Sequence, residues 1–166
     1  MGTVRHLVFE RTIVVQAPAE RVLAAFFDPL DLSEWWQVIR SVTVPRPLGT
    51  YALEWATTEV RDPILGRLGG AFHGTVMEYR PGVECFVADV FWSPPDGDPI
   101  GPMALEVTLS AITSSEGVAL PAAEIATEIR VLQSGFEDSG RWQRYYELVG
   151  TGWERALASL KMLLEK

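Results

Sequence analysis

The residue types that could carry out nucleophilic chemistry are few in this sequence of 166 residues. It contains two histidines, His6 and His73, and a single cysteine, Cys85. A Cys–His pair would require the thiol to lie beside one of the imidazoles, and His73 is conceivable because it falls on the strand predicted next to that of Cys85. The other interpretation, a buried and unreactive thiol, is favoured, since reactive thiols need an electropositive and accessible setting.

The motifs of other catalytic and cofactor-binding classes are incomplete. Neither Ser134 nor Ser139, the two serines followed by glycine near the C-terminus, has the glycine two residues earlier that a nucleophile elbow requires. No histidines or cysteines have a metal-binding spacing. The glycines at 66, 69 and 70 lack the lysine and the strand–loop–helix context of a phosphate-binding loop. The sequence therefore predicts no catalytic residue, no metal site and no cofactor.

Two polar side chains, Arg11 and His73, stand out because their parity along the predicted strands points inward. Arg11 alternates in phase with Phe9, Ile13 and Val15. Its stem can pack while its guanidinium reaches water, or the guanidinium can anchor a ligand carboxylate or phosphate. His73 is either satisfied by a neighbouring group or acts in proton transfer to a substrate within reach.

Aromatic residues are the more informative set, with 6 Trp, 7 Phe and 4 Tyr in the chain. They either fill a bulky core or wall a cavity for a planar or acyl ligand, in which Tyr hydroxyls and Trp N–H groups orient the ligand. We expect a ligand-binding cavity lined by one valine and nine aromatic residues, together with Arg11 and His73. The ten residues are Trp36, Tyr51, Trp55, Phe72, Trp92, Phe136, Tyr145, Tyr146, Val149 and Trp153.

The elements that must position these side chains begin with a predicted strand over 7–16. Pro18 then suits the first helical position of a short helix, which Asp28-Pro29 ends. The segment 31–34 has the spacing of an acidic capping box and predicts a second short helix that carries Trp35 and Trp36.

Strands and turns follow, and then a long helix. Residues 103–111 alternate between apolar and polar, which indicates a sheet covered on one face only. Short turns between neighbouring strands predict antiparallel pairing. Strands are predicted at 38–44, 50–58, 70–80, 83–92, 103–113 and 123–133.

The long helix is predicted over 139–165, capped by Asp138 or Ser139, with apolar residues at helical spacing. Gly150 and Gly152 lie inside it. They indicate either close packing on the sheet or a local break that widens the space beneath. The order of elements predicts an α+β domain with a cavity between sheet and helix.

Several short motifs, in order along nearly the whole chain, carry a resemblance to a known family. They are 13–22 (IVVQAPAERV), Asp28-Pro29, Trp35-Trp36, 73–78 (HGTVME), Pro81, 127–136 (TEIRVLQSGF) and Gly152-Trp153. With them the sequence resembles the START-like (SRPBCC) helix-grip superfamily, in the branch of the activator of the 90-kDa heat-shock protein ATPase. It departs from that pattern at Leu23, where a tryptophan is usual nearby, and at Gln133-Ser134, where a histidine is more common.

The resemblance implies one START-like domain over residues 1–166. Its helix-grip fold would be a curved antiparallel sheet of six to seven strands wrapped on a long C-terminal helix, with two short helices after the first strand. A chaperone is the protein partner that the resemblance implies.

Charge and hydropathy exclude several classes of partner. Lys and Arg number 14 against 22 Asp and Glu, a net charge of −8 that disfavours nucleic acid and anionic membrane surfaces. No apolar run approaches the ~20 residues of a membrane span, and the N-terminal segment lacks the pattern of a signal peptide. The single cysteine fits a reducing compartment. We therefore expect a soluble cytoplasmic protein.

The leading hypothesis from the sequence is binding of a hydrophobic small molecule between the sheet and the last helix. One alternative is an enzyme of the cyclase, dehydratase or hydrolase kind that uses the same cavity, with His73, Arg11 and a tyrosine as acid–base or orienting groups. The other alternative is an interaction module that regulates a chaperone ATPase.

Overall fold

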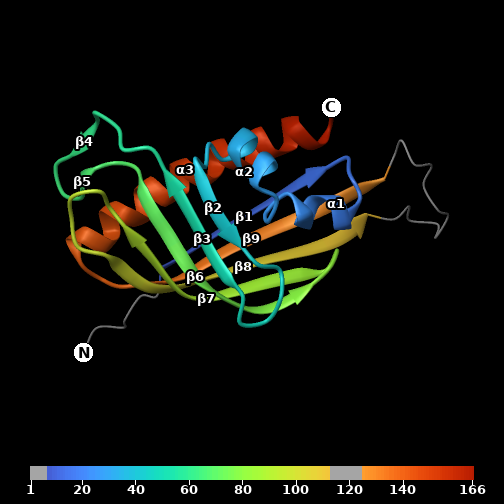
Figure 1. The fold of residues 1–166 in the computed structure, drawn as a ribbon, viewed down its shortest axis with the longest axis horizontal. Helices are drawn as coiled ribbons and strands as arrows, with labels where there is room; N and C mark the ends of the chain where they lie inside the picture. The colour runs from blue at the N-terminus through green and yellow to red at the C-terminus, as the bar shows by residue number, and fades with distance from the viewer. Residues whose placement is uncertain (1–6, 113–124) are drawn as a thin grey trace.

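A seven-stranded antiparallel sheet, crossed on one face by a single long helix, organises residues 7–112 and 125–166, which are the residues that the computed structural model describes (Figure 1). The strand order is β1-β9-β8-β7-β6-β3-β2. The predicted α+β helix-grip fold is therefore confirmed. The strands are β1 (Leu7–Val15), β2 (Arg40–Thr43), β3 (Thr50–Trp55), β6 (Gly70–Arg80), β7 (Glu84–Ser93), β8 (Ile100–Ile112) and β9 (Ala126–Phe136).

Two short helices, α1 (Ala19–Ala24) and α2 (Pro29–Trp35), follow β1 as predicted. The expected capping box at 31–34 was wrong. Asp28 is the N-cap of α2, and its carboxylate accepts the backbone N–H of Asp31 at 3.0 Å. The reason is Pro29, whose fixed φ suits the first helical position and starts the helix earlier than the acidic spacing suggested. Trp36 consequently stands at the C-cap of α2.

The strands differ from the prediction mainly at their ends. β8 begins at Ile100, before the predicted start at 103, and includes Pro102, although proline has no N–H to donate to a strand pairing. Proline is tolerated there because the pairing of β7 with β8 shifts register between Val90 and Trp92, next to Met103. β9 continues to Phe136, since its pairing with β8 persists as far as Ser134. The expected strand ends at 113 and 123 lie outside the described residues.

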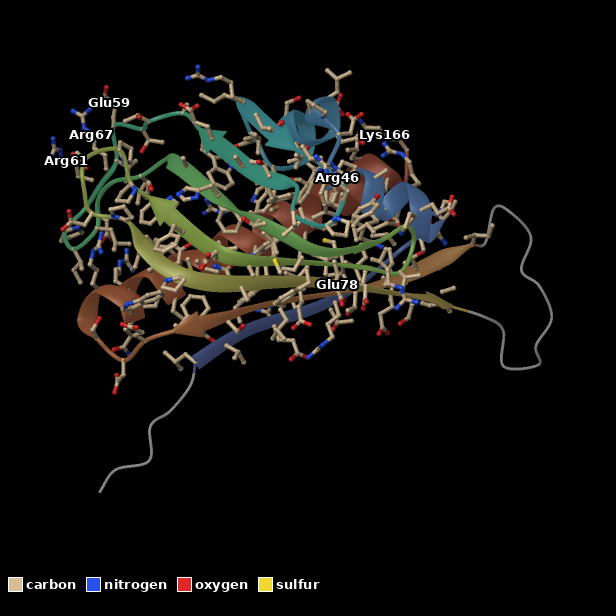
Figure 2. The ribbon with its side chains drawn as sticks, turned by 60° about the horizontal axis from the view of Figure 1, so that its bottom comes forward. Arg46, Glu59, Arg61, Arg67, Glu78 and Lys166 are labelled. Atoms are coloured by element: carbon tan, nitrogen blue, oxygen red, sulfur yellow. The ribbon has the colours of Figure 1, made fainter. Side chains whose placement is uncertain are left out.

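A small hairpin that the sequence did not reveal interrupts the segment between β3 and β6. It consists of β4 (Arg61–Asp62) and β5 (Gly66–Arg67), so the strand expected over 50–58 stops at Trp55. Figure 2 shows Glu59, Arg61 and Arg67 grouped at this end of the molecule. We call residues 56–69 the hairpin loop.

The core lies between the sheet and the helices. The long helix α3 (Gly140–Leu164) begins at Ser139, whose hydroxyl accepts the Trp142 N–H at 3.3 Å. Its apolar stripe is buried against the sheet, and each fully buried large side chain contributes roughly 1.5–3 kcal/mol to folding. The opposite face of the sheet carries charged pairs such as Arg130 with Glu10, at 3.0 Å. The buried residues of the stripe are Trp142, Tyr145, Trp153, Ala156, Leu157 and Leu160.

The two glycines inside α3 do not break it, because the helix is continuous from 140 to 164. A Cβ added at Gly150 would lie 3.9 Å from the Phe9 ring, an ordinary packing distance. A Cβ added at Gly152 would meet nothing within 4 Å. Gly150 therefore packs closely against Phe9 of the sheet, whereas no atom lies near the position that a Gly152 side chain would occupy.

Candidate functional site

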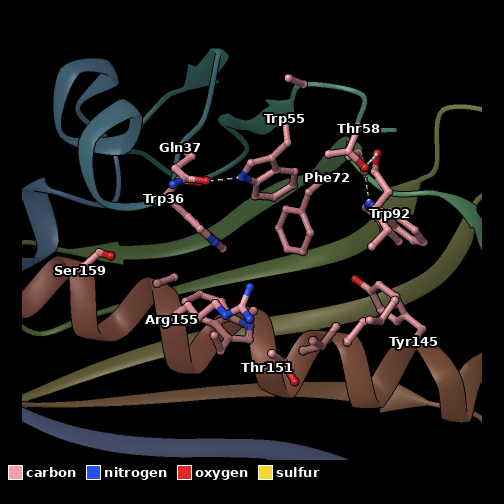
Figure 3. Close-up of a pocket in the computed structure, with 18 of the residues that line it drawn as sticks. Trp36, Gln37, Trp55, Thr58, Phe72, Trp92, Tyr145, Thr151, Arg155 and Ser159 are labelled. Carbon is pink, nitrogen blue, oxygen red and sulfur yellow. Dashed lines mark hydrogen bonds between the residues drawn. The ribbon is translucent and has the colours of Figure 1, made fainter. Parts of the chain in front are cut away.

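A cavity of about 650 Å³ lies between the sheet, the end of α2 and one face of α3 (Figure 3). Its inner wall consists of large rings, and its rim includes exposed residues such as Gln37, Thr58 and Gly152. The cavity is therefore open to solvent along α3 and closed at the sheet. The rings that line it are Trp35, Trp36, Trp55, Phe72, Trp92, Tyr145 and Trp153.

Trp36 is the centre of the aromatic wall. Its ring stacks on Trp35 at a centroid distance of 4.8 Å and lies 4.6 Å from Trp153, which comes from α3. Trp55 meets it edge to face at 5.5 Å. Pairs at such distances stabilise one another by about 0.5–1.5 kcal/mol beyond their buried area. The wall is thus one contiguous cluster drawn from α2, β3 and α3.

Hydrogen bonds fix the orientation of three of these rings. The indole N–H of Trp55 donates to the Trp36 carbonyl at 2.8 Å, and that of Trp92 donates to the Gly69 carbonyl at 2.9 Å. Figure 3 shows both bonds at the edge of the cavity. The indole N–H of Trp153 donates to Oε1 of Gln133 at 2.9 Å. Because their polar edges are already paired with protein, these rings can present apolar faces to a ligand.

Gly69 is required where it stands in this wall. Its φ is +110°, and a Cβ there would collide with the carbonyl oxygen of Ala56 on the other side of the hairpin loop. Only glycine allows the loop backbone to approach closely enough for its carbonyl to accept the Trp92 indole. The position of Trp92 in the cavity therefore depends on Gly69.

Two polar side chains lie at the base of the cavity. Gln133 of β9 is only 1% exposed, and besides accepting from Trp153 it donates from Nε2 to the Met103 sulfur at 3.3 Å. Burial raises the pKa of the Tyr145 hydroxyl, and hydrogen bonding with Gln133 offsets only part of this. Tyr145 thus stays protonated at neutral pH, and Figure 3 shows its hydroxyl directed into the cavity.

The hairpin loop, which supplies Ala56, Thr58, Leu68 and Gly69 to the lining, is anchored to α3 by a partly buried ion pair. The Asp62 carboxylate accepts the Arg144 Nε–H at 2.6 Å and the backbone N–H of Leu65 at 2.9 Å. Burial alone would raise the pKa of Asp62, but these hydrogen bonds, with that from the Ile64 N–H, hold it below its usual value. The loop is thereby held beside the helix that forms the other side of the cavity.

Seven of the twelve residues expected at the cavity line it. They come from α2, three strands of the sheet and α3, so the convergence of these elements is what the prediction required. The seven are Trp36, Trp55, Phe72, Trp92, Tyr145, Val149 and Trp153.

The two polar candidates lie elsewhere. Arg11 does face α3, but its guanidinium is exposed and pairs with Glu154, so its stem packs and its head reaches water. His73 lies on the outer face of β6, because the preceding residue, Phe72, points into the cavity. Its imidazole stacks on Phe91 at 5.8 Å.

The other three expected residues belong to the packed interior or its edge. Tyr51 is 1% exposed, and its hydroxyl donates to the Phe26 carbonyl at 2.9 Å. Phe136 is buried and meets the Tyr146 ring edge to face at 5.1 Å. The Tyr146 hydroxyl donates to the Val8 carbonyl at 3.1 Å. These three rings fill the core beyond the cavity.

Cys85 has no histidine beside it. It lies on β7 next to the strand of His73, as expected, but pairs with Tyr79, whereas His73 pairs with Phe91. Burial raises the pKa of the Cys85 thiol to about 12. Within residues 7–112 and 125–166, no group of three or more His, Cys, Asp or Glu side chains is placed to hold a metal ion.

Three features of the site were not identified from the sequence as ligand contacts. Gln133 had a usable signal, because it continues the inward alternation of Thr127, Ile129 and Val131 in β9. Trp35 and Trp36 are adjacent in sequence, and both rings line the cavity. Arg155 lies outside the buried apolar stripe of α3, so the helical spacing of apolar residues does not point to it.

Comparisons with known proteins support the fold. No family model and no curated protein matches the chain. Among solved structures, protein CV1439 from Chromobacterium violaceum has 25% identity and a TM-score of 0.62, over 96% of this chain and 99% of that one. The Aha1 dimer from Colwellia psychrerythraea has 15% identity and a TM-score of 0.64, over 96% of each chain.

Protein Ms6760 from Mycobacterium smegmatis has a TM-score of 0.66 at 17% identity, over 98% of this chain and 96% of that one. These likenesses are consistent with a START-like (SRPBCC) fold across the length of the chain. None of the helices in the described ranges is both long and apolar enough to cross a membrane.

Proposed function

We propose that the protein binds a hydrophobic small molecule in the cavity between the sheet and α3. The observation that carries the proposal is the cavity itself, about 650 Å³ walled by aromatic rings. Small-molecule sites typically occupy ~300–1,000 Å³ and combine apolar walls with a few polar groups. Covering the exposed ring faces with a ligand would gain roughly 25 cal/mol for each Å² of apolar surface removed from water.

The wall favours a flat ring system or an acyl chain as the bound group. Trp36, Phe72 and Trp153 offer faces and edges that pack against either. Tyr145 at the base supplies a hydroxyl that can orient one polar atom of the ligand, whereas the Gln133 amide is already paired with Trp153 and Met103. The polar groups are too few to bind a sugar or a nucleotide by hydrogen bonds alone.

The proposal assigns no reaction to the cavity. The enzyme alternative used His73, Arg11 and a tyrosine; Tyr145 lines the cavity, but Arg11 and His73 do not. We also propose, from the sequence motifs, that residues 1–166 are one START-like domain of the heat-shock-ATPase-activator branch. The structural similarity to the Colwellia Aha1 dimer supports the START-like fold, which is one part of this proposal. A cytoplasmic location stays a prediction.

The test uses a variant that fills the cavity without disturbing the core. Gly152→Leu places a side chain into space where an added Cβ meets nothing within 4 Å. Ala158→Leu is the matched control, since it adds leucine to an exposed position of α3 that does not line the cavity. Native mass spectrometry of the purified protein and a thermal-shift panel of fatty acids, sterols and aromatic polyketides would report binding.

We expect a co-purified mass or a stabilising ligand with the natural sequence and with Ala158→Leu. Gly152→Leu should lose either signal by at least about tenfold in affinity, because leucine occupies the volume of several ligand carbons. Absence of any mass and any shift would contradict the proposal. Equal binding by Gly152→Leu would place the site elsewhere.

A further inference from the structure

Among the described residues that line the cavity, Arg155 of α3 is the one charged residue and none is a carboxylate. Figure 3 shows Arg155 on the side of the helix that faces the cavity, across from Trp36. Arg155 is exposed at the rim, beside the aromatic wall, in a chain with a net charge of −8.

The surroundings of Arg155 supply no counter-ion. The residues three and four positions away along α3 are Thr151, Gly152, Ala158 and Ser159, none of them acidic, so no ion pair along the helix can form. Among the described residues no carboxylate pairs with it, although other arginines such as Arg11, Arg144 and Arg130 are paired. Its guanidinium retains its capacity to bind an anion.

Further donors lie along the same rim. Thr151, Arg155 and Ser159 follow one another at intervals of four on α3 and all line the cavity, although the Thr151 hydroxyl already donates to the Glu147 carbonyl at 3.3 Å. Within the described part of the chain the Trp36 indole N–H has no protein acceptor, and Figure 3 shows its nitrogen directed toward α3. The mouth of the cavity thus offers hydrogen-bond donors and one positive charge, whereas its base is aromatic.

We propose that the natural ligand is an amphipathic anion, whose apolar body packs on the aromatic wall and whose carboxylate or sulfonate-like head pairs with Arg155. This inference rests on the proposed binding function and names the ligand class for the same cavity. The planar guanidinium can bind a carboxylate through two parallel hydrogen bonds, which a neutral head group cannot match. The anionic head would stay near water at the rim, so its desolvation cost is small.

The experiment compares two matched probe pairs at neutral pH. Anilinonaphthalene sulfonate and N-phenylnaphthylamine share a ring system and differ by the anionic group, and decanoate and decanol do the same for an acyl chain. The fluorescent pair is titrated directly, and the acyl pair is measured by displacement of N-phenylnaphthylamine. Comparing the pairs separates a ring-bearing ligand from an acyl one.

Arg155→Gln is expected to weaken both anionic probes about tenfold and the neutral probes less than twofold, since it removes only the charge-assisted contact. Arg155→Lys should recover part of the loss, because it keeps the charge but not the planar fork. Arg46→Gln is the control for net charge, since Arg46 lies in the turn after β2 and outside the lining. The neutral probes report that each variant is folded with an intact cavity.

Two results would overturn the inference while leaving the binding function in place. One is equal affinity for the anionic and neutral members of each pair, with no effect of Arg155→Gln. The other is an equal loss of affinity for the anionic probes in Arg155→Gln and Arg46→Gln. That result would show that the net charge of the protein, and not a direct contact with Arg155, attracts the anion. Failure of all four probes to bind the natural sequence would instead contradict the binding function itself.

Discussion

Gln133 and Trp153 are joined across the boundary between sheet and helix by a hydrogen bond of 2.9 Å, from the indole N–H to the amide oxygen. Both residues are almost completely buried, and both line the cavity. The bond ties α3 to β9 and holds the Trp153 ring against Trp36 at 4.6 Å. One polar contact therefore positions the part of the aromatic wall that the helix contributes.

Replacing Gln133 with leucine should destabilise the protein by about 1–3 kcal/mol, because the Trp153 N–H would remain buried without an acceptor. Urea unfolding monitored by circular dichroism measures the change. Gln143→Leu, an exposed position on α3, is expected to change the unfolding free energy by less than about 0.5 kcal/mol. Equal effects of the two substitutions would show that the bond has no special role.

The glycines of α3 predict two stabilising substitutions with different effects on the site. Gly150→Ala and Gly152→Ala should each raise the unfolding free energy by about 0.5–1 kcal/mol, since alanine favours a helix and neither Cβ meets an obstacle. Thermal unfolding of both variants checks this. Only Gly152→Ala should also alter probe affinity, because Gly150 does not line the cavity. A lower melting temperature for either variant would contradict the packing described here.

Stability should depend on pH through Asp62. Its pKa is lower in the folded protein than in the unfolded chain, so its contribution is complete above the unfolded pKa of about 3.9 and is lost as the pH falls through the folded value. Asp62→Asn should cost about 1–3 kcal/mol at neutral pH. In acid the gap between the two proteins should close. Glu78→Gln, at an exposed position on β6, serves as the control in urea titrations over this range.

The Cys85 thiol should be inert in the native protein. Burial raises its pKa to about 12, so the reactive thiolate is scarce at neutral pH, and the sulfur is inaccessible. Ellman's reagent should titrate no thiol in native protein and one thiol in guanidinium chloride. Rapid labelling of the native protein would show that β7 opens or that the thiol is accessible.

The sequence predicted the fold well because its signals are local and agree with one another. Alternation over 103–111 and the helical stripe after Ser139 each report which side of an element is buried. The boundaries were less accurate at Asp28 and Pro102. Pro29 starts α2 directly after Asp28, earlier than the acidic spacing suggested. Pro102 is accommodated in β8 because the pairing with β7 shifts register beside it.

The candidate site could be predicted only where side chains point inward along regular elements. Trp92 and Trp153 were found in this way. Tyr51 was not separable from them, because inward direction alone does not say whether a ring meets protein or empty space. The empty space depends on the missing side chain of Gly152 and on the course of the hairpin loop, both of which involve contacts distant in sequence.

The Trp36 cluster has an optical consequence. With the Trp35 and Trp153 rings centred 4.8 and 4.6 Å from that of Trp36, their electronic transitions must couple, and an excitation absorbed by one indole is shared among its neighbours. Any molecule that enters the cavity changes the polarisability beside this coupled group and can shift the mutual tilt of its rings. The protein therefore contains its own chromophore for the occupied and empty states, readable in near-ultraviolet circular dichroism without a label.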